Sequence, residues 1–304
     1  VIGEEINMTY DAPDSWASIL LDHVIWPEHP LGQDVAGTHE SLSRISRDDI
    51  LAHYQACYHP RNMLIAVGGA FEPDKIVAEL EQRLGDWQPG QCPTFAPAPQ
   101  GQTAARWLIE DRPIEQGHLC LALPGLSRTD PDRYALSVLN TILGEGMSSR
   151  LYLNIRETRS LAYVVESGIN FLDDTGSLVV YAGVDSKRAT EALQAILAEL
   201  DRLRDEPVPA EELHKAKEYI KGRLVLGLED SFSQAAWFAS QALLFDTIKT
   251  PAEVLQAYEA VTVEEVQAVA QRVVVPSSYN FVAIGPFGEG PSSRGAALIE
   301  LLRN

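Results

Sequence analysis

The pattern of apolar and polar residues predicts alternating helices and strands along the chain. Ile76, Leu80 and Leu84 recur every fourth residue, which places them on one face of a helix. Short apolar runs bounded by turn residues predict buried strands. The expected helices are 1–27 with a weak point at 11–14, one capped by Ser46, 73–84, 131–143, a short one reaching Arg156, 187–204, 209–228, 263–272 and a short apolar one near the C-terminus. The expected strands are 63–69, 106–110, 117–123, 161–171, 176–184 and 279–284.

This order of elements indicates an α+β fold. From residue 106 the chain reads strand, strand, helix, strand, strand, helices, strand. The strands at 161–171 and 176–184 are close enough to form an antiparallel hairpin. We therefore expect a sheet with helices packed on one of its faces.

Part of the sequence is repeated. The segments Ile45–Ile50 and Val261–Val266 each contain a β-branched residue, a hydroxyl residue that caps a helix, and an acidic pair. A proline, a glycine that ends an apolar strand and a phenylalanine follow in each copy. A constant separation of 216 positions relates Pro60 to Pro276, Gly69 to Gly285 and Phe71 to Phe287. A fixed separation across independent features indicates two copies of one structural unit.

The repeat also predicts how the chain is divided. The second copy begins near Arg106, so the first copy would begin about 110 positions before Val1. We expect one complete copy and the second half of another. The predicted division is 1–88 for the truncated first domain, 89–104 for a linker rich in Pro, Gly and Gln, 105–288 for the second domain, and 289–304 for a tail.

Charge and composition exclude some classes of partner. The 304 residues carry a formal net charge of −19 and no basic patch, which argues against nucleic acid. The longest apolar stretches are too short to predict a membrane span. The acidic charge is compatible with a basic peptide, but solubility explains it more simply.

The residues alone predict no catalytic or metal site. Three widely spaced cysteines form neither a disulfide framework nor a zinc knuckle. None of the seven histidines has HExxH or HxxEH spacing. The segment Gly144-Glu145-Gly146 lacks the third glycine of a dinucleotide motif and is better explained as a tight turn after a helix. No nucleophile elbow or P-loop is present.

Three segments resemble the pitrilysin/insulinase and mitochondrial-processing-peptidase family of zinc peptidases. They are Val1-Ile2-Gly3-Glu4-Glu5-Ile6, the stretch from Pro30-Leu31-Gly32 to Gly69, and 143–168 with its Leu-Gly-Glu-Gly-Met-Ser-Ser-Arg-Leu-Tyr sequence. The resemblance extends over about residues 1–287. It implies two repeated α/β sandwich domains of the processing-peptidase type, the first incomplete, as in a bacterial two-domain member truncated at its N-terminus.

The resemblance assigns roles to three residues. Glu5 matches the third zinc ligand of the family, whereas the alternative is that Glu4 and Glu5 only complement a helix N-terminus. The position 216 residues after Glu5 is Lys221, so the second copy has no ligand there. Arg156 and Tyr163 match a pair that contacts substrate in the non-catalytic domain, the alternative being a surface arginine and a strand tyrosine. The family's HxxEH helix, which supplies two histidine ligands and the general base, is not in this sequence.

The resemblance implies a zinc metalloendopeptidase that hydrolyses peptides or unfolded polypeptide segments. Because HxxEH is lacking, we expect this chain alone to retain no zinc and to cut no peptide. A second hypothesis is a non-catalytic scaffold subunit of a heteromeric peptidase, and the family allows a homodimer or a heterodimer with another member. An unrelated binding protein would require the repeat and the 143–168 match to be coincidental. The compartment stays open between cytoplasm and periplasm.

The truncation predicts a structural consequence. The strand at 63–69 would lack its neighbours and expose an unpaired edge. We expect that edge to be covered by another chain, or the N-terminal part to be poorly ordered.

Overall fold

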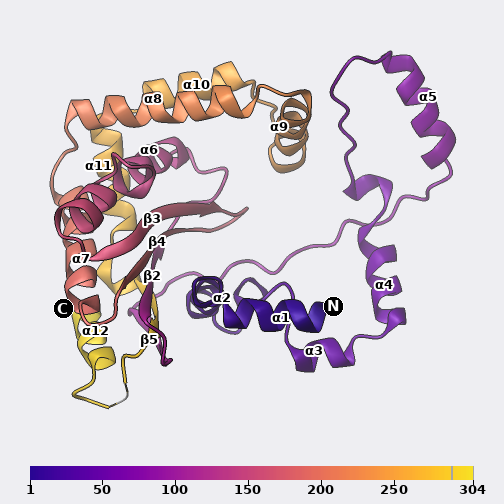
Figure 1. Cartoon of the computed structure of the whole chain (residues 1–304). Coiled ribbons are helices and arrows are strands. Elements are labelled where there is room, and N and C mark those ends of the chain that lie inside the picture. Colours follow the sequence, from indigo (N-terminus) through magenta and orange to yellow (C-terminus); the bar gives the residue numbers. More distant parts are fainter. Residues whose placement is uncertain (289, 304) are drawn as a thin grey trace. The chain divides into compact units, whose positions relative to one another are not determined.

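A five-stranded mixed sheet is the centre of the larger of two compact units (Figure 1). The computed structural model describes residues 1–288 and 290–303. The larger unit comprises Val1–Thr38, Pro97–Ile220 and the chain from Gln256 onward. The strands, in spatial order, are β1 (Arg106–Asp111), β5 (Asn280–Gly285), β2 (Gln116–Pro124), β4 (Gly176–Asp185) and β3 (Ala162–Phe171). β1 is parallel to β5, and the other pairs are antiparallel, including the predicted β3–β4 hairpin.

One face of the sheet is covered by helices whose buried residues form the main core together with the strands. Alternate residues of β2, Leu119, Leu121 and Leu123, point into this core. The helices of this unit are α1 (Ile2–Asp11), α2 (Pro13–Ile25), α6 (Arg133–Gly144), α7 (Ala189–Asp205), most of α8 (Ala210–Gly227), α11 (Val263–Val273) and α12 (Arg294–Arg303). Of these, α6, α7, α8, α11 and α12 contribute buried residues to the main core. Figure 1 shows α6, α7 and α11 on the side of the sheet opposite α2.

The prediction that helices cover only one face is wrong, because α2 packs on the other face. Ala17, Leu21 and Val24 of α2 form a second core with Cys120, Ala122, Val282 and Ile284 of the sheet. All six residues of β5 are buried. A strand that is apolar at every position must be covered on both faces, and α2 provides the second cover.

Local sequence signals set the ends of several helices as predicted. Pro13 begins α2 directly after the break at Ala12. Thr262 caps α11 in a capping box with Glu265. The expected mixed α/β fold is therefore confirmed, and the predicted helices and strands from residue 106 onward are found within a few residues of their expected bounds.

The smaller unit comprises His39–Ala96 and Lys221–Leu255 and consists of helices and extended segments. Its helices are α3 (His39–Arg44), α4 (Arg47–Cys57), α5 (Pro73–Leu84), α9 (Ser231–Leu244) and the start of α10 (Pro251–Ala260). Ser46 caps α4 in a capping box with Asp49, as predicted. Helices α3, α9 and α10 were not predicted.

The prediction of a strand at 63–69 is wrong. These residues are extended but form no strand, and Leu64, Ile65 and Val67 are 38%, 51% and 45% exposed. The physical reason is the lack of partners: no strand within the described part of the smaller unit lies beside this segment. Its counterpart in the repeat, β5, pairs with strands on both sides, and a strand without a ladder leaves its backbone groups unpaired.

The repeat extends to how helices contact these segments. In the repeat, α9 corresponds to the segment 216 positions earlier, which contains most of α2. Helix α2 packs on β5 within the larger unit, and α9 lies against Gly68 within the smaller one. A side chain at Gly68 would meet the backbone oxygen of Ser231 at 2.4 Å, so glycine permits this close approach.

The predicted tail is described in part. Helix α12 (Arg294–Arg303) matches the expected short apolar helix, while positions 289 and 304 lie outside the described residues. Each helix within residues 1–288 and 290–303 is too short or too polar to span a lipid bilayer.

Candidate substrate-binding site

Arg156 and Tyr163 line one pocket in the larger unit. The pocket has a volume of about 440 Å³ and opens where the segment after α6 turns into β3. Its other lining residues are Glu157, Ser160, Leu161, Ala162, Asp185 and Arg188. The structure therefore brings together two side chains that sequence similarity paired. Glu5 is not among the lining residues.

Arg156 lies on a short π-helix, η3 (Tyr152–Thr158). The backbone N–H of Arg159 donates to the carbonyl oxygen of Asn154 at 3.2 Å, which is the five-residue step of a π-turn. The Arg156 guanidinium lies 5.0 Å from the ring centre of Tyr152, within the range of a cation–π contact. Within the described chain Arg156 forms no ion pair, and its exposed guanidinium can donate hydrogen bonds to a ligand.

Tyr163 is the extra residue of a β-bulge. The pairing of β3 with β4 skips from Ala162 to Val164, so Tyr163 has no partner in the ladder. A bulge turns a side chain away from the regular alternation of a strand. The Tyr163 side chain is 61% exposed and stands at the pocket wall, where its hydroxyl can donate or accept a hydrogen bond.

The turn between Arg156 and Tyr163 is held in an unusual conformation. Ser160 has a φ of +49°, in the left-handed region that residues other than glycine rarely occupy. The backbone N–H of Leu161 donates to the carbonyl oxygen of Ile155 at 2.9 Å, and Arg188 donates to the carbonyl oxygen of Ser160 at 3.2 Å. These bonds fix the chain that joins the two pocket residues.

The second arginine of the pocket is already paired. The Nε of Arg188 lies 3.0 Å from a carboxylate oxygen of Glu191. This hydrogen-bonded arginine holds the pKa of the Glu191 carboxyl below its ordinary value. Arg188 therefore supports the wall of the pocket, and Arg156 is the guanidinium available to a ligand.

The glycines before η3 allow the site to approach the core. A methyl group at Gly144 would lie 2.4 Å from the Ser167 hydroxyl oxygen and 2.5 Å from its backbone nitrogen. Ser167 in turn donates to the Asn140 side chain at 2.7 Å, and both residues are buried. Gly146 has a φ of +89°, which turns the chain tightly after α6. The prediction that this segment is a tight turn after a helix is confirmed.

The residues described here do not form a complete zinc site. Glu5 lies in the first turn of α1, is exposed, and its backbone N–H donates to the carbonyl oxygen of Val1. Within residues 1–288 and 290–303, no group of three His, Cys, Asp or Glu side chains is arranged to hold a metal ion. The role of Glu5 as a ligand stays a prediction that requires ligands from outside this chain.

Asn154 of η3 and Glu199 are hydrogen-bonded to each other, a contact that was not found from the sequence. Glu199 lies on α7, 45 positions after Asn154, and each looks like an ordinary polar residue of a helix. No short motif relates them, so only the structure places them together.

Solved structures share this fold. A crystal structure of a peptidase M16 inactive domain from Pseudomonas fluorescens matches with a TM-score of 0.85 at 21% identity, over 94% of this chain and 68% of that one. A chain in complex III2 from Candida albicans, solved with Inz-5 bound, matches with a TM-score of 0.84 at 21% identity, over 99% of this chain and 73% of that one. At these identities the similarity shows the fold alone.

Relatives known from sequence are more similar. A protein of Bacillus subtilis called the uncharacterized zinc protease YmxG is 32% identical over 292 residues, which cover 96% of this chain and 70% of the relative. An uncharacterized zinc protease of Streptomyces coelicolor is 32% identical over 297 residues, covering 96% of this chain and 64% of the relative. One from Mycobacterium tuberculosis is 33% identical over 291 residues, covering 95% and 66% respectively. This chain thus spans about two thirds of the length of these relatives.

The family match includes the pocket. Residues 44–220 match the family described as the peptidase M16 inactive domain, a range that contains Arg156, Tyr163 and the segments that hold them. Together with relatives at 32% and 33% identity, this confirms the resemblance noted in the sequence. The chain belongs to the peptidase M16 family.

Proposed function

We propose that this chain is the substrate-holding, non-catalytic part of a zinc metalloendopeptidase that acts on peptides or unfolded polypeptide segments. The observation that carries the proposal is the pocket in which Arg156 and Tyr163 meet. The zinc protease names of its relatives support the peptidase part of the proposal, and the match to an inactive domain supports the non-catalytic role.

The chemistry of the pocket suits a peptide backbone. A guanidinium offers several N–H donors in a planar fork, and a tyrosine hydroxyl adds another donor. Both can hydrogen-bond to carbonyl oxygens of an extended chain, and neither needs a particular side chain on the ligand. Such a pair can hold or polarise a peptide carbonyl without itself supplying a nucleophile.

Zinc, in this proposal, belongs to the intact peptidase. Glu5 would be one ligand, and the remaining ligands and the general base would come from residues outside this chain. When bound, zinc would supply an activated water for peptide hydrolysis. Since the described residues form no set of three ligands, we expect the 304-residue chain alone to retain no stoichiometric zinc and to cut no peptide.

Two measurements on the purified chain test the proposal. Metal analysis and a fluorogenic peptide assay are expected to show neither bound zinc nor cleavage, and stoichiometric zinc with activity would overturn this part. Binding of a fluorescent unfolded peptide, followed by anisotropy, tests the pocket. Arg156→Ala is expected to weaken binding about tenfold, the size of one lost hydrogen bond from a charged donor. Tyr163→Phe is expected to weaken it less.

A matched control separates the pocket from the overall charge. Arg83 on α5 is exposed and, among residues 1–288 and 290–303, pairs only with Glu79 on its own helix. Arg83→Ala removes the same charge at a residue that does not line the pocket, so binding should be unchanged. Equal losses for Arg83→Ala and Arg156→Ala would show that the peptide responds only to net charge.

A scaffold subunit is the second candidate. The match to an inactive domain favours it, and the Candida albicans neighbour was solved as part of a complex. In this case the chain would form a homodimer or a heterodimer with a catalytic family member. Unchanged peptide binding in Arg156→Ala, together with stable association with such a member, would favour the scaffold.

A further inference from the structure

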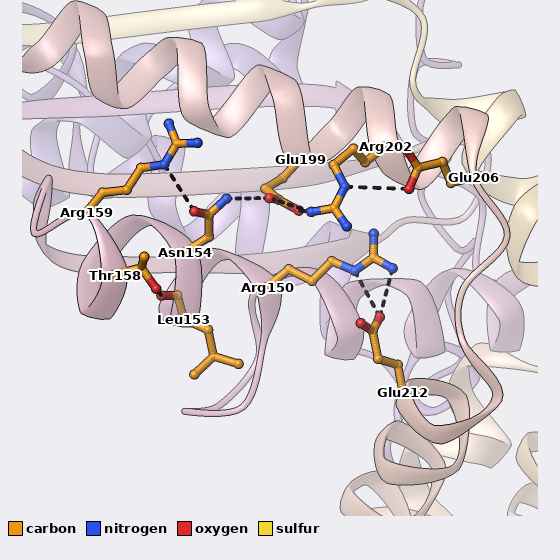
Figure 2. Close-up of polar contacts among 9 residues, drawn as sticks. All are labelled: Arg150, Leu153, Asn154, Thr158, Arg159, Glu199, Arg202, Glu206 and Glu212. Carbon is orange, nitrogen blue, oxygen red and sulfur yellow. Dashed lines mark hydrogen bonds and ion pairs between the residues drawn. The ribbon is translucent and has the colours of Figure 1, made fainter.

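A buried carboxylate is bonded to the π-helix that carries Arg156. Glu199 on α7 is 2% exposed, and within the described chain it is the only acidic residue that is fully buried. Figure 2 shows its side chain between Asn154 of η3 and Arg202 of its own helix. The Arg202 Nη1 donates to the two carboxylate oxygens at 3.1 and 3.3 Å, and the Asn154 side-chain amide donates to Oε1.

Asn154 connects this carboxylate to the π-turn. Its side-chain oxygen accepts from the Arg159 Nε at 3.1 Å, and its backbone oxygen accepts from the Arg159 N–H at 3.2 Å. Thr158 closes a second five-residue step by donating its hydroxyl to the Leu153 carbonyl at 2.8 Å (Figure 2). The α7 carboxylate is thus bonded to the residue whose carbonyl oxygen accepts the π-turn bond from Arg159.

The bonded segment is the one that presents the pocket residues. Arg156 lies between Asn154 and Arg159, and the turn at Ser160 leads directly to Tyr163. Each hydrogen bond of a π-helix spans five residues where that of an α-helix spans four, so the side chains point in different directions. If this segment relaxed to an α-helix, the direction of Arg156 would change.

We propose that Glu199 and Asn154 are positioning residues, which fix η3 so that Arg156 and Tyr163 face the same pocket. This inference rests on the proposed function for its consequence in peptide binding, but not for its structural content. Stability alone is a poor explanation of Glu199. Burying a carboxylate is costly, and apolar residues of similar volume often replace buried ion pairs with no loss of stability.

Three substitutions test the positioning role. Glu199→Leu removes the acceptor and keeps the volume, Asn154→Ala removes the donor, and Glu199→Gln keeps an acceptor for Asn154. Glu206→Gln is the matched control, because Glu206 also forms an ion pair with Arg202, at 3.6 Å (Figure 2), but is exposed and, among the described residues, makes no bond to η3. Urea unfolding of each variant first establishes that it folds.

Hydrogen exchange of the backbone amides in 152–163 is the primary measurement. We expect Glu199→Leu and Asn154→Ala to speed exchange there about tenfold, the effect of losing one bond to a charged group. Exchange in the sheet should stay unchanged, and Glu199→Gln and Glu206→Gln should stay within about threefold of the parent. Unchanged exchange at 152–163 in both Glu199→Leu and Asn154→Ala would overturn the proposal.

Peptide binding provides a readout that a merely structural role would not change. Glu199→Leu is expected to weaken binding about tenfold while the urea midpoint is kept, and to have little further effect in an Arg156→Ala background. If Glu199→Leu lowers the midpoint and binding together, and Glu199→Gln does the same, the role is structural and the proposal fails. If Arg156→Ala leaves binding unchanged, the proposed function fails, while the exchange result still decides whether Glu199 and Asn154 fix the π-helix.

Discussion

Gly144 provides a direct test of how the site is attached to the core. Replacing it with alanine would place a methyl group 2.4 Å from the Ser167 hydroxyl oxygen, 2.5 Å from its nitrogen and 2.8 Å from its Cβ. Two of these three atoms belong to the side chain, but the nitrogen belongs to the backbone of β3. The clash therefore cannot be relieved by rotating a side chain, and α6 and β3 must move apart.

The expected cost can be worked out from opposing effects. Overpacking a close contact costs about 1 to 3 kcal/mol. Loss of the buried bond from Ser167 to Asn140, 2.7 Å long, adds about 1 to 2 kcal/mol. The greater helix propensity of alanine returns at most about 1 kcal/mol, because Gly144 is the last residue of α6. The net result is a loss of about 2 to 4 kcal/mol in the free energy of unfolding.

Urea denaturation of Gly144→Ala, followed by circular dichroism, measures this loss. Gly168 is the matched control: it lies in β3, next to Ser167, and a methyl group there would meet no atom within 4 Å. Gly168→Ala should not lower the unfolding free energy, and the smaller backbone entropy of alanine should raise it by at most about 1 kcal/mol. A Gly144→Ala variant as stable as the parent, or more stable, would refute the reasoning, since propensity would then outweigh the contact.

Two further predictions concern the half-buried Asp22 of α2 and the buried Cys120 of the second core. Burial raises the pKa of Asp22 from 3.8 to about 6, so the ionised form destabilises the fold and stability falls as pH rises from about 4 to 6. Complete burial would correspond to about 3 kcal/mol, which partial exposure reduces to about 1 to 2 kcal/mol. Asp22→Asn should raise the unfolding free energy by that amount at pH 7.5 but not at pH 4, and a gain at both pH values would contradict the assignment. Burial, with a smaller effect of Asp14, raises the pKa of the Cys120 thiol to about 12. A maleimide should therefore modify Cys92 and Cys57 in the native chain but Cys120 only in denaturant, and mass spectrometry of the labelled peptides would reveal native labelling of Cys120 if the reasoning is wrong.

Local signals made most of the larger unit predictable. The capping residue Thr262, the helix-starting Pro13 and the apolar runs of β2 and β5 each act within a few residues of the chain. The helices and strands that these signals predict do form, because the neighbouring elements of the larger unit pack against them. The fixed separation of 216 positions added a long-range relation that single residues could not provide.

The wrong predictions came from properties that depend on partners. The segment 63–69 has the same apolar pattern as β5, yet only β5 pairs with neighbouring strands. A strand is defined by its ladder, which the sequence of one segment cannot reveal. The position of α2 on the second face was likewise missed, because the full burial of β5 indicates that a cover is needed but does not say which helix supplies it.

The candidate site was likewise only partly predictable from the sequence. Arg156 and Tyr163 were identified because the segment around them resembles a known family, and the structure places both at one pocket. The β-bulge that exposes Tyr163 and the bond between Asn154 and Glu199 leave no pattern in the sequence. Both depend on how the chain packs in three dimensions.

The segment that carries the pocket is anchored to the core at two points. At one end, Gly144 lets α6 approach β3 closely enough for Ser167 to bond to Asn140. In the middle, Glu199 of α7 is bonded to Asn154 of the π-helix. A loop that connects a helix to a strand is usually mobile, but here the two anchors belong to the two helices that cover the same face of the sheet. We therefore expect the main core to set the direction of Arg156 and Tyr163, so that substitutions at Glu199 and Asn154, which do not line the pocket, weaken peptide binding.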